Sequence, residues 1–344
     1  MLVVAVSASI SWMLARGRLL GAIDVPNERS LHARPIPRTG GIAILSAIAL
    51  GVAVSSVLSR RGSIAHPLGW LPVEAWAASV VAVAFGLIVT ISLIDDFRGL
   101  TAGQRLACHV VASFLIALVS LRLDAVNLPW VGVFGLGWMA WPITMLGVVW
   151  MTNLYNFMDG MDGFAAGMTI SGFGTIAIVA SLSGDHALAT FCVIVAAAAA
   201  GFLILNFPPS RIFMGDVGAV SIGFVAAVVG IAGFRRASID PGAVALAFAP
   251  FVVDASVTLA LRALRGVSLW KPHREHGYQR LVLAGWSHRR TVLAEYFLMA
   301  LSSLAALVWQ FGGDAAKAAI FVVTVGMAAA MARIVARAGY QRRP

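Results

Sequence analysis

The chain has 344 residues, of which 60% are hydrophobic and 12% charged, and its mean hydropathy is +0.89. Soluble domains average about 45–50% apolar and about 25% charged residues, so this composition excludes an ordinary soluble protein and predicts a polytopic membrane protein. The formal net charge is +10. Because the basic residues flank apolar stretches, as topology signals do, no nucleic-acid partner is indicated.

Apolar stretches recur along the whole chain. A transmembrane helix needs about 20 mostly apolar residues, and eleven stretches qualify, without a repeat or a linker between them. We therefore predict one all-α integral membrane domain over residues 1–344. The predicted spans are residues 1–20, 40–58, 75–94, 105–121, 137–155, 164–182, 187–206, 219–234, 242–262, 291–310 and 315–335.

The distribution of basic residues predicts the orientation. The first apolar stretch has no basic residue before it, which favours a retained anchor with its N-terminus outside over a cleaved signal. In that orientation the cytoplasmic segments, including the C-terminus, hold 19 of the 25 Lys and Arg residues. This agrees with the positive-inside rule. Cys108 and Cys192 both fall in predicted spans and indicate neither a disulfide nor a thiolate metal site.

Asp95 and Asp96 end the third span, in the segment ISLIDDF. Carboxylates at a helix C-terminus face the negative end of the helix dipole, and two adjacent carboxylates repel each other. Stability alone gives no reason to place them there, whereas a divalent cation or a phosphate-bearing ligand does. The other interpretation is a solvated helix end.

Residues 153–164 read NLYNFMDGMDGF, where the fifth span ends. Polar groups at membrane depth are costly and indicate a site. On a regular helix Asn153, Asn156 and Asp159 share one broad face. Gly160 and Gly163 weaken the helix, so the chain could unwind and turn Asp162 toward the others. Amides and carboxylates suit a base, a sugar or a metal; the other interpretation is a polar helix terminus.

Asp216 lies among glycines in the segment IFMGDVG, at the start of the eighth span. A helix N-terminus suits phosphate, and a carboxylate there could hold Mg²⁺ against it. Phe213 could offer an aromatic face to a base or lie at the membrane interface. In the predicted topology all three acidic segments face the cytoplasm.

Two basic loops are predicted on the same side as the acidic segments. Residues 24–41 read DVPNERSLHARPIPRTGG and include Arg29, His32, Arg34 and Arg38. Residues 271–280 read KPHREHGYQR and include His273 and His276, which could bind metal or phosphate or act as general acid–base groups. Cationic loops beside acidic helix ends suit a phosphate-rich ligand.

These blocks resemble the bacterial polyprenyl-phosphate N-acetylhexosamine-1-phosphate transferases. That family includes the phospho-MurNAc-pentapeptide translocase and the WecA-type enzymes of O-antigen and teichoic acid synthesis. The resemblance runs from Asp24 to about Tyr278 and is closest to the O-antigen-initiating subgroup. It rests on five ordered blocks, DVPNERSLHARPIPRTGG, LIDD, NLYNFMDGMDGFAAG, NFPPSRIFMGDVG and HREHGYQR.

The resemblance implies transfer of an N-acetylhexosamine 1-phosphate from a UDP-sugar to undecaprenyl phosphate, with release of UMP. It implies Mg²⁺, or alternatively Mn²⁺, as cofactor, and the bacterial inner membrane as location. By position Asp95 would orient or deprotonate the lipid phosphate with support from Asp96, and Asp216 would bind the metal. The implied nucleotide-sugar and phosphate contacts are Asn153, Asn156, Asp159, Asp162, Phe213 and Arg38. His273 and His276 occupy the histidine-rich motif of the family.

The chain departs from the family pattern at two places. The common HxHH pattern appears as His273-Arg274-Glu275-His276, so Glu275 replaces one histidine. Gly99 stands where the peptidoglycan enzyme has a phosphate-binding lysine, which leaves Arg98 or Arg105 to take that role. The sugar (GlcNAc, GalNAc, QuiNAc or FucNAc), the pathway and homodimer formation stay open.

The acidic residues are also compatible with other classes of protein. Intramembrane acids also occur in ion-coupled transporters, but there they lie near the bilayer midplane. The acids here gather at one membrane face, except for Asp254, which lies inside the ninth span. Asp254 is either a buried group that hydrogen-bonds between helices or a residue that supports the site. A prenyl-diphosphate enzyme is disfavoured because Gly99 breaks the DDxxD pattern, and a scaffold would not need clustered acids.

Overall fold

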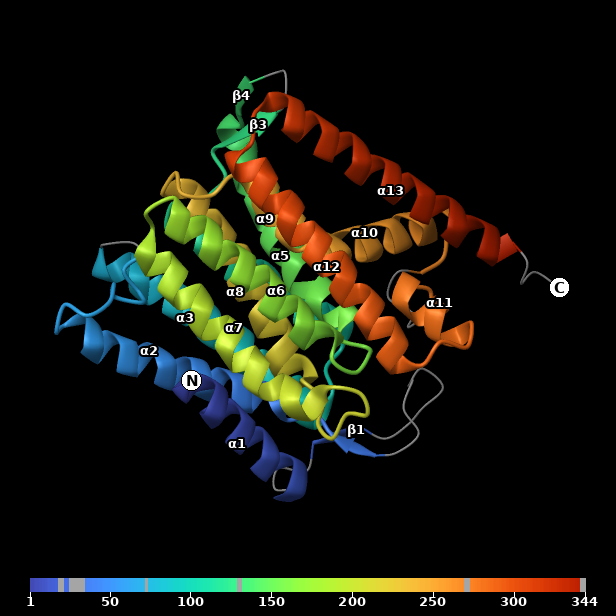
Figure 1. Ribbon diagram of the computed structural model, residues 1–344, viewed down its shortest axis with the longest axis horizontal. Helices are drawn as coiled ribbons and strands as arrows, with labels where there is room; N and C mark the ends of the chain where they lie inside the picture. Colours follow the sequence, from blue (N-terminus) through green and yellow to red (C-terminus); the bar gives the residue numbers. More distant parts are fainter. Residues whose placement is uncertain (18–21, 25–34, 72–73, 129–131, 269–272, 341–344) are drawn as a thin grey trace.

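A computed structural model describes residues 1–17, 22–24, 35–71, 74–128, 132–268 and 273–340, with side chains described except at residues 17, 127–128 and 330–340 (Figure 1). Nearly all regular structure in this part of the chain is helical. In chain order the helices are α1 (Leu2–Gly17), α2 (Gly40–Ser59), α3 (Ala75–Arg98), α4 (Ala102–Leu118), the 3-10 turn η1 (Gly137–Met139), α5 (Ala140–Met158), α6 (Phe164–Leu182), α7 (His186–Asn206), α8 (Gly215–Arg235), α9 (Pro241–Ala247), α10 (Ala249–Leu264), α11 (Gly277–Leu283), α12 (His288–Phe311) and α13 (Asp314–Tyr340).

Two short antiparallel hairpins correct the all-α prediction. In the first, β1 (Ile23–Asp24) pairs with β2 (Ile36–Pro37); in the second, β3 (Ala125–Leu128) pairs with β4 (Gly132–Gly135). Both lie in connections between apolar stretches, where hairpin pairing satisfies backbone groups that no helix uses. They lie at opposite ends of the helical bundle (Figure 1).

Each of the eleven predicted spans overlaps a helix in the described part of the chain. Among the described residues, six helices are long and apolar enough to cross a membrane, namely α2, α3, α6, α7, α8 and α12. The α9–α10 pair would add a seventh, and α1 and α4 are shorter apolar helices. These lengths and compositions agree with a multi-pass membrane protein, whereas the count of eleven spans stays a prediction.

The predicted span 242–262 is not one straight helix, since α9 and α10 meet at Phe248 with a bend of 83°. Pro250 lies in the first turn of α10 and has no backbone N–H to donate, so it interrupts the helical hydrogen bonds. The carbonyl of Leu246 accepts a hydrogen bond from the Ser302 hydroxyl of α12 instead. The break is therefore a consequence of a proline placed inside an apolar run.

Side-chain caps fix where several helices begin. Thr101 and Gln104 form a capping box at the start of α4, and Asp185 accepts a hydrogen bond from the Leu188 N–H at the start of α7. Ser287 caps α12 in the same way. Such caps satisfy backbone N–H groups that have no partner within the helix. The Thr101 cap matters for the site because Arg105 follows directly in α4.

Helix α8 lies at the centre of the bundle. Its apolar window is 83% buried, against 28% for α2, α3 and α12. Glycines let neighbouring helices approach its backbone: a methyl group at Gly223 would lie 2.6 Å from the Met151 carbonyl oxygen and 2.8 Å from Tyr155 Cβ, both in α5. This close α5–α8 contact holds the ends of both helices in register at the site described below.

We therefore expect Gly223→Ala to destabilise the protein by about 1–3 kcal/mol, because the added methyl group has no room. Thermal unfolding of the detergent-purified protein measures the effect. The matched control is Gly174→Ala in α6, where no atom lies within 4 Å of the added methyl group. The control should unfold at the wild-type temperature or above it, and an equal loss in both variants would contradict the packing argument.

Candidate active site

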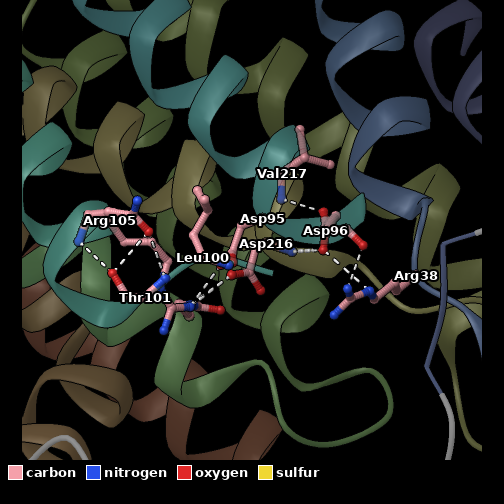
Figure 2. Close-up of polar contacts among 10 residues, drawn as sticks. Arg38, Asp95, Asp96, Leu100, Thr101, Arg105, Asp216 and Val217 are labelled. Atoms are coloured by element: carbon pink, nitrogen blue, oxygen red, sulfur yellow. Dashed lines mark hydrogen bonds and ion pairs between the residues drawn. The ribbon is translucent and has the colours of Figure 1, made fainter. Parts of the chain in front are cut away.

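Side chains from four helix ends meet at one place in the structure. Asp95 lies in the last turn of α3, and Asp216 lies in the first turn of α8. Both contact Arg105: its Nη1 atom lies 2.9 Å from Asp95 Oδ2 and 3.2 Å from Asp216 Oδ2 (Figure 2). Asn156, near the end of α5, donates from Nδ2 to Asp216 Oδ2 at 3.4 Å. Residues separated by more than a hundred positions thus converge, as the acidic segments predicted.

Asp159 adds a further carboxyl group. It follows the end of α5 directly, and its backbone N–H is bonded to the Tyr155 carbonyl. Burial raises the pKa of Asp159 well above its usual value, and the nearby carboxylates of Asp216 and Asp96 raise it further. Negative charge gathered around one carboxyl group in this way favours a cation beside it.

Asp96 does not point in the same direction as Asp95. Its carboxylate accepts hydrogen bonds from the backbone N–H groups of Asp216 and Val217, each at 3.0 Å. Arg38 lies against it, with Nε 3.6 Å from Asp96 Oδ1. Figure 2 shows Asp96 between Arg38 and the start of α8, while Asp95 turns toward Asp216.

The remaining arginine and aromatic predictions have different outcomes. Arg105, not Arg98, joins the acidic groups: Arg98 is exposed on α3 and makes no ion pair with them among the residues that the structure describes. Phe213 is partly buried, and its backbone bonds to Pro37 and Gly40 at the start of α2. Its stacking on a base stays a prediction. Arg29, His32 and Arg34 lie outside the described residues.

The segment after α5 unwinds as its glycines predicted, with α5 ending at Met158 and α6 beginning at Phe164. The Asp162 side chain, however, bonds to Ser210 N–H at 3.2 Å and Ser210 Oγ at 2.9 Å, and lies 3.4 Å from His288 Nδ1. It is buried between two loops, where it anchors this segment. The Nδ2 group of Asn153 donates to the Val149 carbonyl of its own helix at 2.7 Å.

These contacts predict a pH-dependent contribution of Asp162 to stability. Burial alone would favour its neutral form, but the contacts from His288 and Ser210 lower the pKa of Asp162 below its ordinary value. A lowered pKa stabilises the fold above the unfolded-state pKa of about 3.9, and this stability is lost as the pH falls through the folded-state value.

We expect Asp162→Asn to lower the unfolding temperature at pH 7 and to unfold closer to wild type at about pH 2, below the unfolded-state pKa. At neutral pH the loss should be about 1.5–3 kcal/mol, as for hydrogen bonds to a charged group. Thermal scans of both proteins at the two pH values measure the difference. A difference that does not change with pH would contradict a charged Asp162.

The histidine motif packs beside this segment. His276 is buried, and its Nδ1 lies 3.2 Å from Asp254 Oδ1, which also accepts the Gly277 N–H at 3.0 Å. Asp254 therefore joins α10 to the start of α11, in agreement with the prediction of a buried hydrogen-bonding group. Burial lowers the pKa of His273 to about 4, and its part in phosphate binding or acid–base chemistry stays a prediction.

Glu275, the residue that departs from the family pattern, faces arginines. It pairs with Arg262, its Oε2 lies 3.5 Å from Arg265 Nη1, and Arg280 Nη2 lies 3.9 Å away. A carboxylate in that position neutralises a basic surface. A histidine could not do this, which gives the substitution a structural reason.

Three supporting residues were not assigned a role from the sequence. Tyr278 donates from its hydroxyl to the Phe157 carbonyl at 3.4 Å, Asn206 accepts the Gly163 N–H at 2.9 Å, and Tyr296 donates to the Gly163 carbonyl at 2.8 Å. Tyr278 and Asn206 belong to the sequence blocks HREHGYQR and NFPPSRIFMGDVG, so these motifs could have marked both residues as part of the site. Tyr296 lies in an apolar span, where no motif marks it.

Comparison with known proteins identifies the family. The model of glycosyl transferase family 4 matches residues 77–234. A probable undecaprenyl-phosphate N-acetylglucosaminyl 1-phosphate transferase of Bacillus subtilis is 31% identical over 294 residues, 84% of this chain and 77% of that protein. The chain belongs to glycosyl transferase family 4. The matched region contains Asp95 and Asp216, which meet in Figure 2, and Asn156, which donates to Asp216.

Other relatives of the chain cover similar lengths. A decaprenyl-phosphate N-acetylglucosaminephosphotransferase of Mycolicibacterium smegmatis is 30% identical over 92% of this chain and 82% of its own length. A phospho-N-acetylmuramoyl-pentapeptide-transferase of Staphylococcus carnosus is 26% identical over 79% of this chain and 84% of its own. These relatives are transferases and give no support to the transporter alternative.

Proposed function

We propose that the protein transfers an N-acetylhexosamine 1-phosphate from a UDP-sugar to undecaprenyl phosphate, giving undecaprenyl-diphospho-sugar and UMP. The observation that carries the proposal is the convergence of Asp95, Asp216 and Arg105 at the ends of apolar helices. It is supported by relatives that are named polyprenyl-phosphate N-acetylglucosamine phosphotransferases. The product would begin an O-antigen or another cell-envelope polysaccharide.

The donor set suits Mg²⁺. Among the described residues no three His, Cys, Asp or Glu side chains surround one metal position. Mg²⁺ does not require such a cage, since it takes one or two carboxylates and completes its shell with water and substrate phosphates. Asp216 would hold it, with Asp95 beside it, and Mn²⁺ would bind the same oxygen donors. When bound, the ion neutralises charge on the transferred phosphoryl group.

The residues of the chain have separate tasks in the proposed reaction. Asp95 orients and deprotonates the lipid phosphate, whose oxygen attacks the sugar-linked β-phosphorus. The new phosphoanhydride bond forms as the bond to UMP breaks, so the exchange needs no ATP. Arg105 reduces the repulsion between the two polyanions, and the main contribution to catalysis is positioning and charge neutralisation. A two-step route through an aspartyl phosphate is the alternative.

We place the site on the cytoplasmic face of a bacterial inner membrane, in a chain with eleven spans and an external N-terminus. The distribution of 19 of 25 basic residues to one side supports this orientation. Single cysteines introduced at Ser63 and Arg211, which lie in connections predicted on opposite sides, would report it through a membrane-impermeant thiol reagent. Labelling of Arg211→Cys from outside intact cells would contradict the orientation.

UMP release tests the proposed reaction directly. Purified protein, undecaprenyl phosphate, Mg²⁺ and a panel of UDP-linked GlcNAc, GalNAc, QuiNAc and FucNAc should give UMP with at least one donor. The same protein in proteoliposomes should show no ion-coupled uptake. UMP release that does not depend on the lipid phosphate, or is absent with every donor, would reject the proposal.

A further inference from the structure

The two adjacent aspartates of the LIDD block have different neighbours. Successive residues on an α-helix point about 100° apart, so Asp95 and Asp96 leave the helix in different directions. Asp95 contacts Arg105 at 2.9 Å and accepts the Leu100 N–H at 2.5 Å. Asp96 is only 4% exposed and turns toward the backbone of α8 (Figure 2).

Asp96 caps α8 from another helix. The first N–H groups of a helix have no partner within it, and Met214, the residue that precedes α8, provides no side-chain cap. Asp96 uses one oxygen for the Asp216 N–H and the other for the Val217 N–H, each at 3.0 Å. A negative charge at this position also complements the helix dipole.

Arg38 holds Asp96 in this position. Its guanidinium donates to the Asp96 carbonyl and lies 3.6 Å from the carboxylate. The chain around Arg38 is itself bonded to the segment that precedes α8: Phe213 N–H donates to Pro37 O at 2.8 Å, and Gly41 N–H donates to Met214 O at 2.7 Å. The backbone of Asp216 is thus fixed from both α2 and α3.

We propose that Asp96 is a positioning residue and not a catalytic one. Its carboxylate, held by Arg38, fixes the first turn of α8 so that the Asp216 carboxylate faces Asp95 and Arg105. The carboxylate is buried and turned toward the backbone N–H groups of α8, away from the point where Asp95, Asp216 and Arg105 meet. The inference rests on the proposed function, in which Asp216 binds the metal ion.

Asp96→Asn tests the inference, because the amide keeps one acceptor oxygen and replaces the other with a donor. Hydrogen exchange followed by mass spectrometry should show faster exchange in a peptide that covers residues 213–220. The Mg²⁺ concentration for half-maximal UMP release should rise about 10–100-fold, as for groups that orient metal ligands. High Mg²⁺ should restore much of the rate in this variant, but none in Asp95→Asn.

Asp185→Asn is the matched control. Asp185 is also buried and also caps a helix, through the Leu188 N–H, but it lies beyond the far end of α6, about 28 Å from Phe164 at 1.5 Å per residue. This variant should unfold at a lower temperature with an unchanged Mg²⁺ requirement. Arg38→Lys, a milder change if Asp96→Asn does not fold, should shift exchange and Mg²⁺ requirement in the same direction.

The outcomes separate the two proposals. Asp96→Asn with a wild-type Mg²⁺ requirement, or inactive at every Mg²⁺ concentration like Asp95→Asn, would overturn the positioning role. Unchanged exchange over residues 213–220 would overturn it as well. If the wild type releases no UMP, the proposed function fails, whereas the exchange measurement still decides whether Asp96 fixes the start of α8.

Discussion

Asp95→Asn is expected to lower UMP release by about 1,000-fold or more while the protein still inserts into the membrane and purifies normally. The amide removes the negative charge that faces Arg105 at 2.9 Å and with it the ability to accept a proton. Loss of a general base costs typically about 100- to 10,000-fold. The hydrogen bond from Leu100 N–H can remain, because the amide retains an acceptor oxygen.

The measurement is the initial rate of UMP release with saturating UDP-sugar and undecaprenyl phosphate. Asp124→Asn is the matched control, since Asp124 is 44% exposed and pairs with Arg235 away from the site. Exposed pairs contribute about 0–1 kcal/mol, so this variant should keep the wild-type rate. Full activity of Asp95→Asn would remove this residue from the reaction and leave the proposed mechanism without a base.

The helices and the end of the bundle that carries the acidic groups could be predicted from the sequence, because both follow from local patterns. Runs of apolar residues fold into helices in a membrane, since the backbone finds no other partner there. Acids at the ends of three such runs then lie near one membrane face. Asp216 begins α8 and Asp159 follows α5, as predicted.

Orientation within the site could not be predicted, because it depends on contacts between distant segments. Asp162 turns to Ser210 and His288 because α7, α8 and α12 bring those loops to it. The same holds for Asp96, whose partners are 120 and 121 residues away. Pro250 could have predicted the break between α9 and α10. The spans are predicted only from the length of each apolar run, and such a run can contain a proline.

Asp216→Ala should abolish transfer more completely than any substitution at the periphery of the site. In the proposed reaction Asp216 is the metal ligand, and a bound ion contributes several kcal/mol of charge stabilisation, about 1,000-fold in rate. The substitution also leaves Arg105 with Asp95 as its remaining acidic partner at this point. The Asp96 cap of α8 uses backbone N–H groups, so the helix start should survive the loss of the side chain.

Two measurements define the expected result for Asp216→Ala. UMP release should stay at background over the whole range of Mg²⁺ and Mn²⁺ concentrations, because the ligand itself is missing. Hydrogen exchange over residues 213–220 should remain close to wild type, since Asp96 still accepts the N–H groups of residues 216 and 217. Activity that returns at high Mg²⁺ would assign the metal to another carboxylate of the site, such as Asp95, which shares Arg105 with Asp216.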